Sequence, residues 1–115
     1  MQVIFESRDN EGRQFQALAE QRVRFVLRRL SWLVPQVNIR MSDVNGPRGG
    51  IDKRCQVELS AQGNGRIVST AMAADWRAAL EGALSRAARR IVRSVQRSQV
   101  RQRPQPRQRP FAADV

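Results

Sequence analysis

Along the chain, segments in which apolar residues recur at every second position alternate with segments in which they recur every three or four positions. Residues 2–7 (QVIFES) are rich in residues that favour extended backbone and predict a first strand. Between residues 13 and 33, apolar side chains recur at spacings of three and four, which predicts an amphipathic helix. These side chains are Phe15, Ala19, Val23, Val26, Leu30 and Leu33. Because proline cannot continue a helix, we expect this helix to end before Pro35.

The middle of the chain predicts three more strands. Residues 36–44 alternate, with Val37, Ile39 and Met41 on one side. Residues 53–61 alternate in the same way, and residues 66–72 form the last strand. The intervening sequences NGPRGG (45–50) and QGNG (62–65) predict a loop and a hairpin turn.

A second helix is predicted over residues 75–97, with Asp75 as an N-cap or first-turn acid. Its apolar stripe is formed by Leu80, Leu84, Ala87 and Ile91, and it is extended by Trp76 and Val95. Residues 98–110 contain three prolines, four arginines and no acid. Such a composition cannot bury enough apolar surface to fold, so we expect residues 98–115 to be a disordered basic tail.

The predicted order is β-α-β-β-β-α, which indicates an α+β fold. Each strand has one apolar face, so we expect a four-stranded sheet with both helices packed on the same face. The opposite face is then left to solvent or to a partner. The length allows one domain, which we place at residues 1–97, followed by the tail.

The charge of the chain is strongly basic. Twenty-one basic residues face ten acidic ones, for a net charge of +11, and all the basic residues except Lys53 are arginines. The guanidinium group offers a planar set of donors that suits phosphate, and its plane can stack on bases. Solubility alone would be served by mixed charges, so the excess favours nucleic acid as the partner.

Several classes of function are disfavoured. The chain has no histidine and one cysteine, which removes the commonest general base and zinc ligand. We therefore expect no enzymatic activity, no cofactor, no metal and no small-molecule substrate. No apolar run approaches the roughly 18 residues needed to span a bilayer, and the first residues do not resemble a secretory signal. We expect a cytoplasmic protein that does not bind membranes.

The predicted second helix carries the most informative charge pattern. Its basic residues at spacings of four, three and four are Arg86, Arg90, Arg93 and Arg97, with Arg89 beside them. By helix geometry this stripe lies about 120° from the apolar one. Like charges at these spacings repel by a few tenths of a kcal/mol per pair. Solvated faces normally mix signs, so the stripe favours an anionic partner.

Further basic residues are candidates for the same surface. On the predicted first helix, the basic residues spread over more of the circumference, so binding and a solvated face are equally supported. They are Arg22, Arg24, Arg28 and Arg29. Three strand residues, Arg40, Lys53 and Arg54, could extend a basic patch across the sheet.

Three other features have a structural explanation that we favour. Cys55 lies on the apolar face of a strand with no histidine to activate it, which favours a buried hydrophobe over a nucleophile. Trp32 and Trp76 adjoin apolar helix positions, so packing is favoured over base stacking. The loop at 45–50 lacks a Walker pattern, so a strand connection is favoured over a phosphate cradle.

Two stretches resemble a known family. Residues 42–59 (SDVNGPRGGIDKRCQVEL) and residues 75–90 (DWRAALEGALSRAARR) are similar to the hibernation-promoting-factor and ribosome-associated-inhibitor family, with Arg77 where the family often has tyrosine. The resemblance covers about residues 1–97. It implies the same fold and binding in the messenger and transfer RNA channel of the small ribosomal subunit. It also implies ribosomal-RNA contacts by basic residues, which correspond here to Arg29, Arg86, Arg89, Arg93 and Arg97.

The sequence therefore predicts a non-enzymatic translation inhibitor that binds the small ribosomal subunit and its RNA near the decoding region. We expect it to be monomeric away from the ribosome. Two alternatives stay open. One is a general structured-RNA-binding protein or chaperone without ribosome preference. The other is an adaptor that binds a protein through the exposed face of the sheet.

Overall fold

In the computed structural model of the chain, the backbone is described for residues 1–44, 52–63 and 65–102, and side chains are described as far as Arg97. The elements are β1 (Gln2–Ser7), α1 (Asn10–Arg13), α2 (Gln16–Val26), the 3₁₀ turn η1 (Arg28–Leu30), β2 (Gln36–Asp43), β3 (Lys53–Ala61), β4 (Gly65–Ala73) and α3 (Trp76–Gln102). The predicted α+β fold with a β-α-β-β-β-α order is confirmed. The loop predicted at 45–50 lies outside the described residues.

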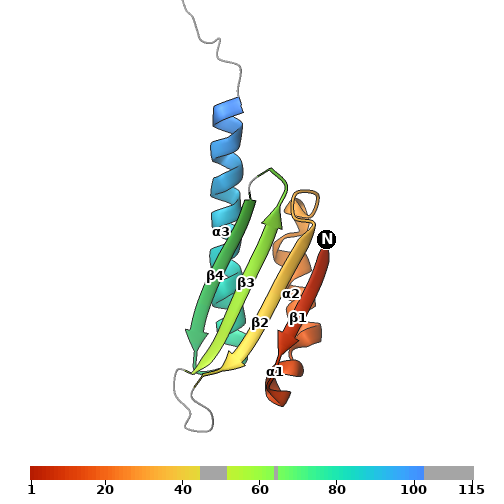
Figure 1. Cartoon of the computed structure of the whole chain (residues 1–115), viewed down its shortest axis with the longest axis vertical. Coiled ribbons are helices and arrows are strands. Elements are labelled where there is room, and N and C mark those ends of the chain that lie inside the picture. The colour runs from red at the N-terminus through yellow and green to blue at the C-terminus, as the bar shows by residue number, and fades with distance from the viewer. Residues whose placement is uncertain (45–51, 64, 103–115) are drawn as a thin grey trace, which may run out of the picture.

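The four strands form one sheet in the order β1-β2-β3-β4. β1 pairs parallel with β2, and the other two pairs are antiparallel. A parallel pair needs a crossover, which α1, α2 and η1 supply on one face of the sheet. Figure 1 shows α2 and α3 side by side behind the sheet, with α2 behind the β1 side and α3 behind the β4 side.

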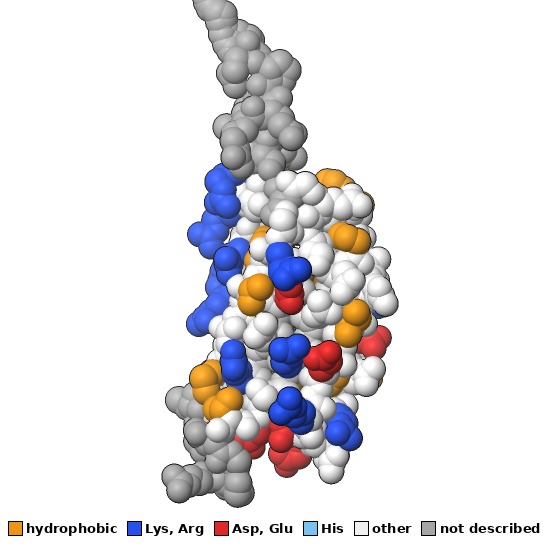
Figure 2. Space-filling model, in the orientation of Figure 1, with side chains coloured by type: hydrophobic (Ala, Val, Ile, Leu, Met, Phe, Trp, Pro, Cys, Tyr) orange, Lys and Arg blue, Asp and Glu red, His pale blue; other side chains and the backbone are white. Residues whose placement is uncertain are grey.

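The core lies between the sheet and the two long helices. The predicted inward residues Val37, Ile39 and Met41 are buried, and so are their partners Leu59, Val57 and Cys55 on β3. The predicted apolar stripe of α3 (Leu80, Leu84, Ala87 and Ile91) is fully buried against them. The opposite face of the sheet carries a mixture of basic, acidic, polar and hydrophobic side chains and is not covered by any described element (Figure 2).

The prediction of one continuous helix over residues 13–33 is wrong. The chain already enters a helical turn at Asn10, and it leaves α-helical geometry at Leu27, where φ is −102° and ψ is 17°. Beyond this point the hydrogen-bonding pattern changes. The Leu30 amide donates to the Leu27 carbonyl and the Leu33 amide donates to the Leu30 carbonyl, both at 2.9 Å, and these are bonds of the 3₁₀ type. The segment after Leu27 therefore forms tighter turns and not a continued α-helix.

The interpretation of Trp32 is also wrong. We expected it to pack in the core or at its rim, but its side chain is 68% exposed. Its indole donates a hydrogen bond to the Arg29 carbonyl at 3.1 Å, while the next two residues, Leu33 and Val34, are buried. Trp76 is buried as expected, although its indole Nε1 has no hydrogen-bond partner.

The hairpin turn predicted at 62–65 is confirmed between β3 and β4. Gly63 and Gly65 have φ values of 74° and 76°, a left-handed conformation that glycine adopts without steric cost. The second helix is longer at its C-terminal end than the predicted range of 75–97, and the division of the chain into a domain and a tail stays a prediction. Residues 98–102 continue α3, which extends beyond the end of the sheet (Figure 1). The disorder predicted for residues 103–115 lies outside the described residues.

The burial of α3 predicts how its residues contribute to stability. Leu84→Ala should lower the free energy of unfolding by about 2–5 kcal/mol, because it leaves a cavity at a fully buried site. Val92→Ala, at an exposed site on the same helix, should change it by less than about 0.5 kcal/mol. Urea unfolding followed by circular dichroism measures both, and equal losses would contradict the described packing of α3.

Candidate nucleic-acid interface

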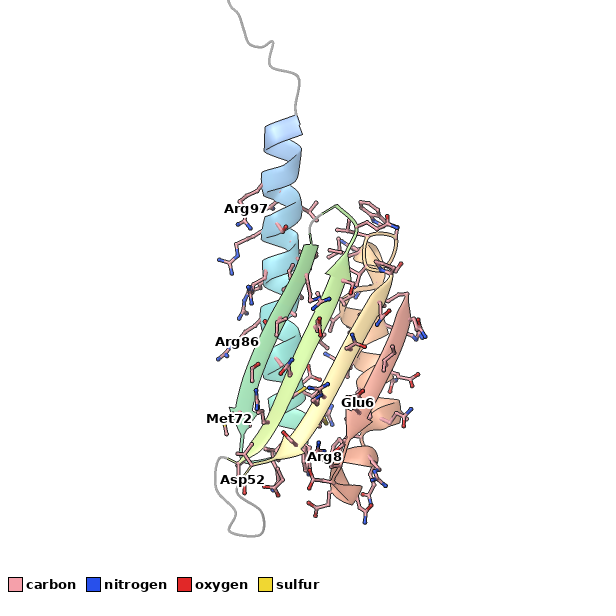
Figure 3. All side chains as sticks on the ribbon, in the orientation of Figure 1. Glu6, Arg8, Asp52, Met72, Arg86 and Arg97 are labelled. Atoms are coloured by element: carbon pink, nitrogen blue, oxygen red, sulfur yellow. The ribbon has the colours of Figure 1, made fainter. Side chains whose placement is uncertain are left out.

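The arginine stripe is displayed by α3. The helix begins where the Asp75 side-chain oxygen Oδ1 accepts a hydrogen bond from the Ala78 backbone amide at 2.7 Å, which confirms the predicted N-cap. The apolar stripe then fixes which side of the helix faces the sheet. The exposed residues on the other side include Arg86, Arg89, Arg90, Arg93 and Arg97. They form a continuous basic margin beside β4 (Figures 2 and 3).

Two of these arginines are attached to the edge of the sheet. β4 is an edge strand, so its outward carbonyl groups have no neighbouring strand to pair with. Arg86 Nη1 donates a hydrogen bond to the Thr70 carbonyl at 2.8 Å, and Arg90 Nη1 donates to the Val68 carbonyl. Four residues of an α-helix rise about 6 Å, and two residues of a strand span about 6.6 Å. The spacing of the two elements therefore matches, and the two arginines satisfy consecutive outward carbonyls.

The arginines line an open groove between α3 and β4. One part has a volume of about 440 Å³ and is lined by Arg66, Ile67, Arg90, Arg93, Ser94 and Arg97. The adjoining part has a volume of about 300 Å³ and is lined by Val68, Ser69, Thr70, Arg86, Arg89, Arg90 and Arg93. The two parts share Arg90 and Arg93. No acidic side chain lines either part, so the groove is uniformly basic.

Arg93 and Arg97 are the least engaged members of the stripe. Arg89 donates a hydrogen bond to the Ser85 hydroxyl at 3.2 Å. Among the residues that the structure describes, Arg93 and Arg97 take part in no hydrogen bond or ion pair. Their guanidinium groups therefore keep all their donors for an external anion.

Arg66 belongs to this groove but was not among the residues predicted from the sequence. It is the second residue of β4, its side chain points to the open face, and it pairs with Glu58 at 2.8 Å. In the sequence it stands next to the turn glycine Gly65, away from any basic cluster. Only the pairing of β4 at the sheet edge brings it beside α3.

The predicted basic residues of α2 and η1 make different contacts from those of α3. Arg22 forms a two-pronged ion pair with Glu81 of α3, with distances of 2.7 and 3.2 Å. It connects the two helices and is only partly exposed. Arg28 stacks over the ring of Phe25 at 4.3 Å from the ring centroid. Arg29 is exposed, and its carbonyl accepts a hydrogen bond from the Trp32 indole.

The two predicted strand residues also differ. The Lys53 amino group lies 2.9 Å from Asp43 Oδ2 and 3.2 Å from Asp52 Oδ1, and its side chain is nearly buried. The hydrogen bond to Asp43, with a further contribution from Asp52, raises the pKa of Lys53 above its ordinary value. Lys53 thus neutralises two carboxylates inside the protein. Arg54 is exposed on the open face of the sheet.

The cysteine and the possible metal ligands are the other candidates for chemistry in this domain. Cys55 is fully buried, and burial raises the pKa of its thiol to about 12, so it is a packed hydrophobe as predicted. Within the described part of the chain, no group of three or more histidine, cysteine or acidic side chains is placed to hold a metal. None of the helices in that part is long and apolar enough to cross a membrane.

Together the fold and the groove define a small α+β domain with a basic margin formed by its last helix and its edge strand. A solved structure with this fold is the N-terminal domain of Protein Y from Thermus thermophilus, with a TM-score of 0.57 and 19% identity. The match covers 81% of this chain and 98% of that one. No family model matches the sequence, and a search of curated proteins found no match. At this identity, the likeness establishes the shared fold.

The buried thiol predicts a loss of stability in alkali. Above its ordinary pKa of 9.0, Cys55 loses its proton when the chain unfolds, whereas the folded thiol keeps it until about pH 12. Raising the pH from 8 to 10 should therefore lower the free energy of unfolding by about 1 kcal/mol. Lys53, whose folded pKa is raised, acts in the same direction at higher pH.

Urea unfolding of the wild type and of Cys55→Ala at both pH values measures this effect. The chain contains no tyrosine, which removes one competing titration. The wild type should lose more stability than the variant. An identical loss in the two proteins would show that the thiol is not protected by burial.

Proposed function

We propose that this protein is a ribosome hibernation factor that binds the small ribosomal subunit near the decoding region and inhibits translation by blocking messenger and transfer RNA. The observation that carries the proposal is the acid-free groove between α3 and β4, lined by six arginines. The similarity of the fold to the Protein Y domain favours a function of the ribosome-hibernation type. The resemblance of residues 42–59 and 75–90 to the hibernation family gives independent support.

The chemistry of the groove suits the backbone of a folded RNA. Guanidinium groups at intervals of about 5–6 Å along a helix can contact successive phosphates without reading bases. The groove is open along its length, so it can follow a polynucleotide chain. Structured RNA is recognised mainly by shape and phosphate contacts, and a rigid row of arginines on a helix provides both.

The residues proposed for ribosomal-RNA contact fall into two groups, according to whether each one is exposed at the surface or already held in an internal ion pair. We assign the primary role to Arg86, Arg89, Arg90, Arg93 and Arg97, and we add Arg66. Arg28, Arg29 and Arg54 are exposed and remain in the proposed surface. Arg22 and Lys53 are engaged in internal ion pairs, so we assign them to positioning the helices and the strand ends rather than to RNA.

The same surface would also serve a general structured-RNA-binding protein, because a row of arginines has no preference for the ribosome. Co-sedimentation of the full chain with isolated small subunits, at near-physiological salt, separates the two functions. The proposal expects saturable binding near one to one that messenger and initiator transfer RNA displace. Unsaturable binding, or equal displacement by an unrelated structured RNA, would favour the general function.

A matched pair of variants tests the groove itself. Arg93→Glu with Arg97→Glu changes two arginines that make no described internal contact, so the fold should survive. Because about two phosphate contacts are lost, subunit affinity should fall at least tenfold and the log–log salt slope should decrease by about 1.5–2. The control, Arg8→Glu with Arg77→Glu, changes the net charge equally.

The control residues lie far from the groove. Arg8 follows β1 and lies at the end of the domain away from Arg97 (Figure 3). Arg77 is the second residue of α3, 20 positions before Arg97 on the same helix. The control variant should bind nearly as the wild type does. Equal weakening by both variants would show that net charge, and not the groove, governs binding, and unchanged binding of the folded groove variant would contradict the assignment of this face.

A further inference from the structure

Two large aromatic side chains are exposed where α2 passes into η1. Phe25 is 54% and Trp32 is 68% exposed. Single exposed hydrophobic residues are common on protein surfaces and need no explanation. These two, however, flank exposed arginines within a stretch of eight residues, and the arrangement of all four side chains is ordered by specific contacts.

The four residues lie in the short segment where α2 passes into η1. Two contacts join them in pairs, Phe25 with Arg28 and Arg29 with Trp32, and the pairs adjoin because Arg28 and Arg29 are neighbours at the start of η1. The Arg28 guanidinium lies 4.3 Å from the centroid of the Phe25 ring and also donates a hydrogen bond to the Phe25 carbonyl at 2.7 Å. The Trp32 indole Nε1 donates to the Arg29 carbonyl at 3.1 Å.

These contacts leave the Trp32 ring and the outer face of the Arg28 guanidinium for a flat ligand. The indole N–H already has its partner, so Trp32 needs no further hydrogen bond and can offer its ring surface. The Arg22 guanidinium also lies 5.4 Å from the centroid of the Phe25 ring, but its charge is neutralised by Glu81. The acid of α2, Glu20, lies about 140° from Phe25 around that helix. The exposed surface therefore combines aromatic rings and guanidinium planes with the positive charge of Arg28 and Arg29.

We propose that Phe25, Arg28, Arg29 and Trp32 form a site that holds unpaired nucleobases of single-stranded RNA by stacking. Aromatic rings and guanidinium planes are the groups on which splayed bases stack, and the arginines supply the attraction to the adjoining phosphates. The inference rests on the proposed function only in taking RNA as the partner. It adds a second kind of recognition, directed at unpaired bases and not at the phosphates of structured RNA.

This stacking site is separate from the groove of α3. α2 packs against β1, whereas α3 packs against β3 and β4. The two helices contact each other through the Arg22–Glu81 ion pair, but the groove lies on the β4 side of α3, whereas α2 lies behind the β1 side of the sheet (Figure 1). One RNA or two segments of the same RNA can therefore occupy both surfaces, and either surface can be removed by mutation without changing the other.

The two tryptophans provide a direct measurement. Trp32 is exposed and Trp76 is buried, so a stacked base should quench the fluorescence of Trp32 alone. Titration of the full chain with a twelve-nucleotide oligouridine should give saturable quenching. A blunt RNA duplex of equal length should quench much less, and Trp32→Leu should abolish the quenching by oligouridine.

Affinity for oligouridine, measured by fluorescence anisotropy, tests both rings. Phe25→Leu with Trp32→Leu keeps apolar side chains and all charges, and it should weaken binding about tenfold with an unchanged salt slope. The control replaces two exposed apolar residues of β4, Val68→Leu with Met72→Leu, and should bind as the wild type does. Equal affinities of all three proteins, together with unquenched Trp32, would overturn the stacking site.

The outcomes separate this inference from the proposed function. If the ring variant binds oligouridine normally but Arg93→Glu with Arg97→Glu loses small subunits, the stacking site fails and the hibernation function stands. If oligouridine quenches Trp32 while small subunits are not bound, the function fails and the site stands. Quenching that rises with protein concentration in the absence of RNA would identify a second copy of the chain as the occupant and would overturn the inference.

Discussion

The contact between α3 and the margin of the sheet is the interaction on which the rest of this structure depends. On its inner side, the stripe from Leu80 to Ile91 closes the core. On its flank, Arg86 and Arg90 satisfy carbonyl groups of the edge strand β4. Burial of the apolar stripe supplies the driving force, and it also fixes the rotation of the helix. The arginine stripe is exposed in one defined direction because the opposite side is committed to the core.

This arrangement gives the arginines two roles. An edge strand with free carbonyl groups is a site for unwanted pairing with another chain. Arg86 and Arg90 cover part of that edge, so they protect it while their remaining donors stay at the surface. Arg93 and Arg97 lie farther along α3 and have no described internal partner. Within the basic margin, Arg86 and Arg90 therefore contact β4, whereas Arg93 and Arg97 are left for an anionic partner to neutralise.

The internal ion pairs show why charge alone does not identify a binding residue. Arg22 and Lys53 carry the same charge as the arginines of the groove, yet each is paired with a carboxylate at less than 3 Å. An ion pair that is partly buried replaces solvent for both partners, and breaking it to bind RNA costs free energy. Arginines without internal partners bear no such cost, which is why the free members of the α3 stripe are the better candidates for contact.

The sequence by itself determined the order of elements, the inward faces of the strands, the N-cap at Asp75 and the position of the α3 stripe, because these depend on local periodicity and local hydrogen bonding. It predicted a helix through residue 33, whereas the structure forms 3₁₀-type turns after Leu27 and leaves Trp32 exposed. Only the tertiary structure placed Arg66 beside α3 and paired Arg22 with Glu81, since each contact joins two elements, and Arg22 and Glu81 are 59 positions apart in the sequence. Local pattern fixes which face a side chain occupies, and packing decides which charges remain free.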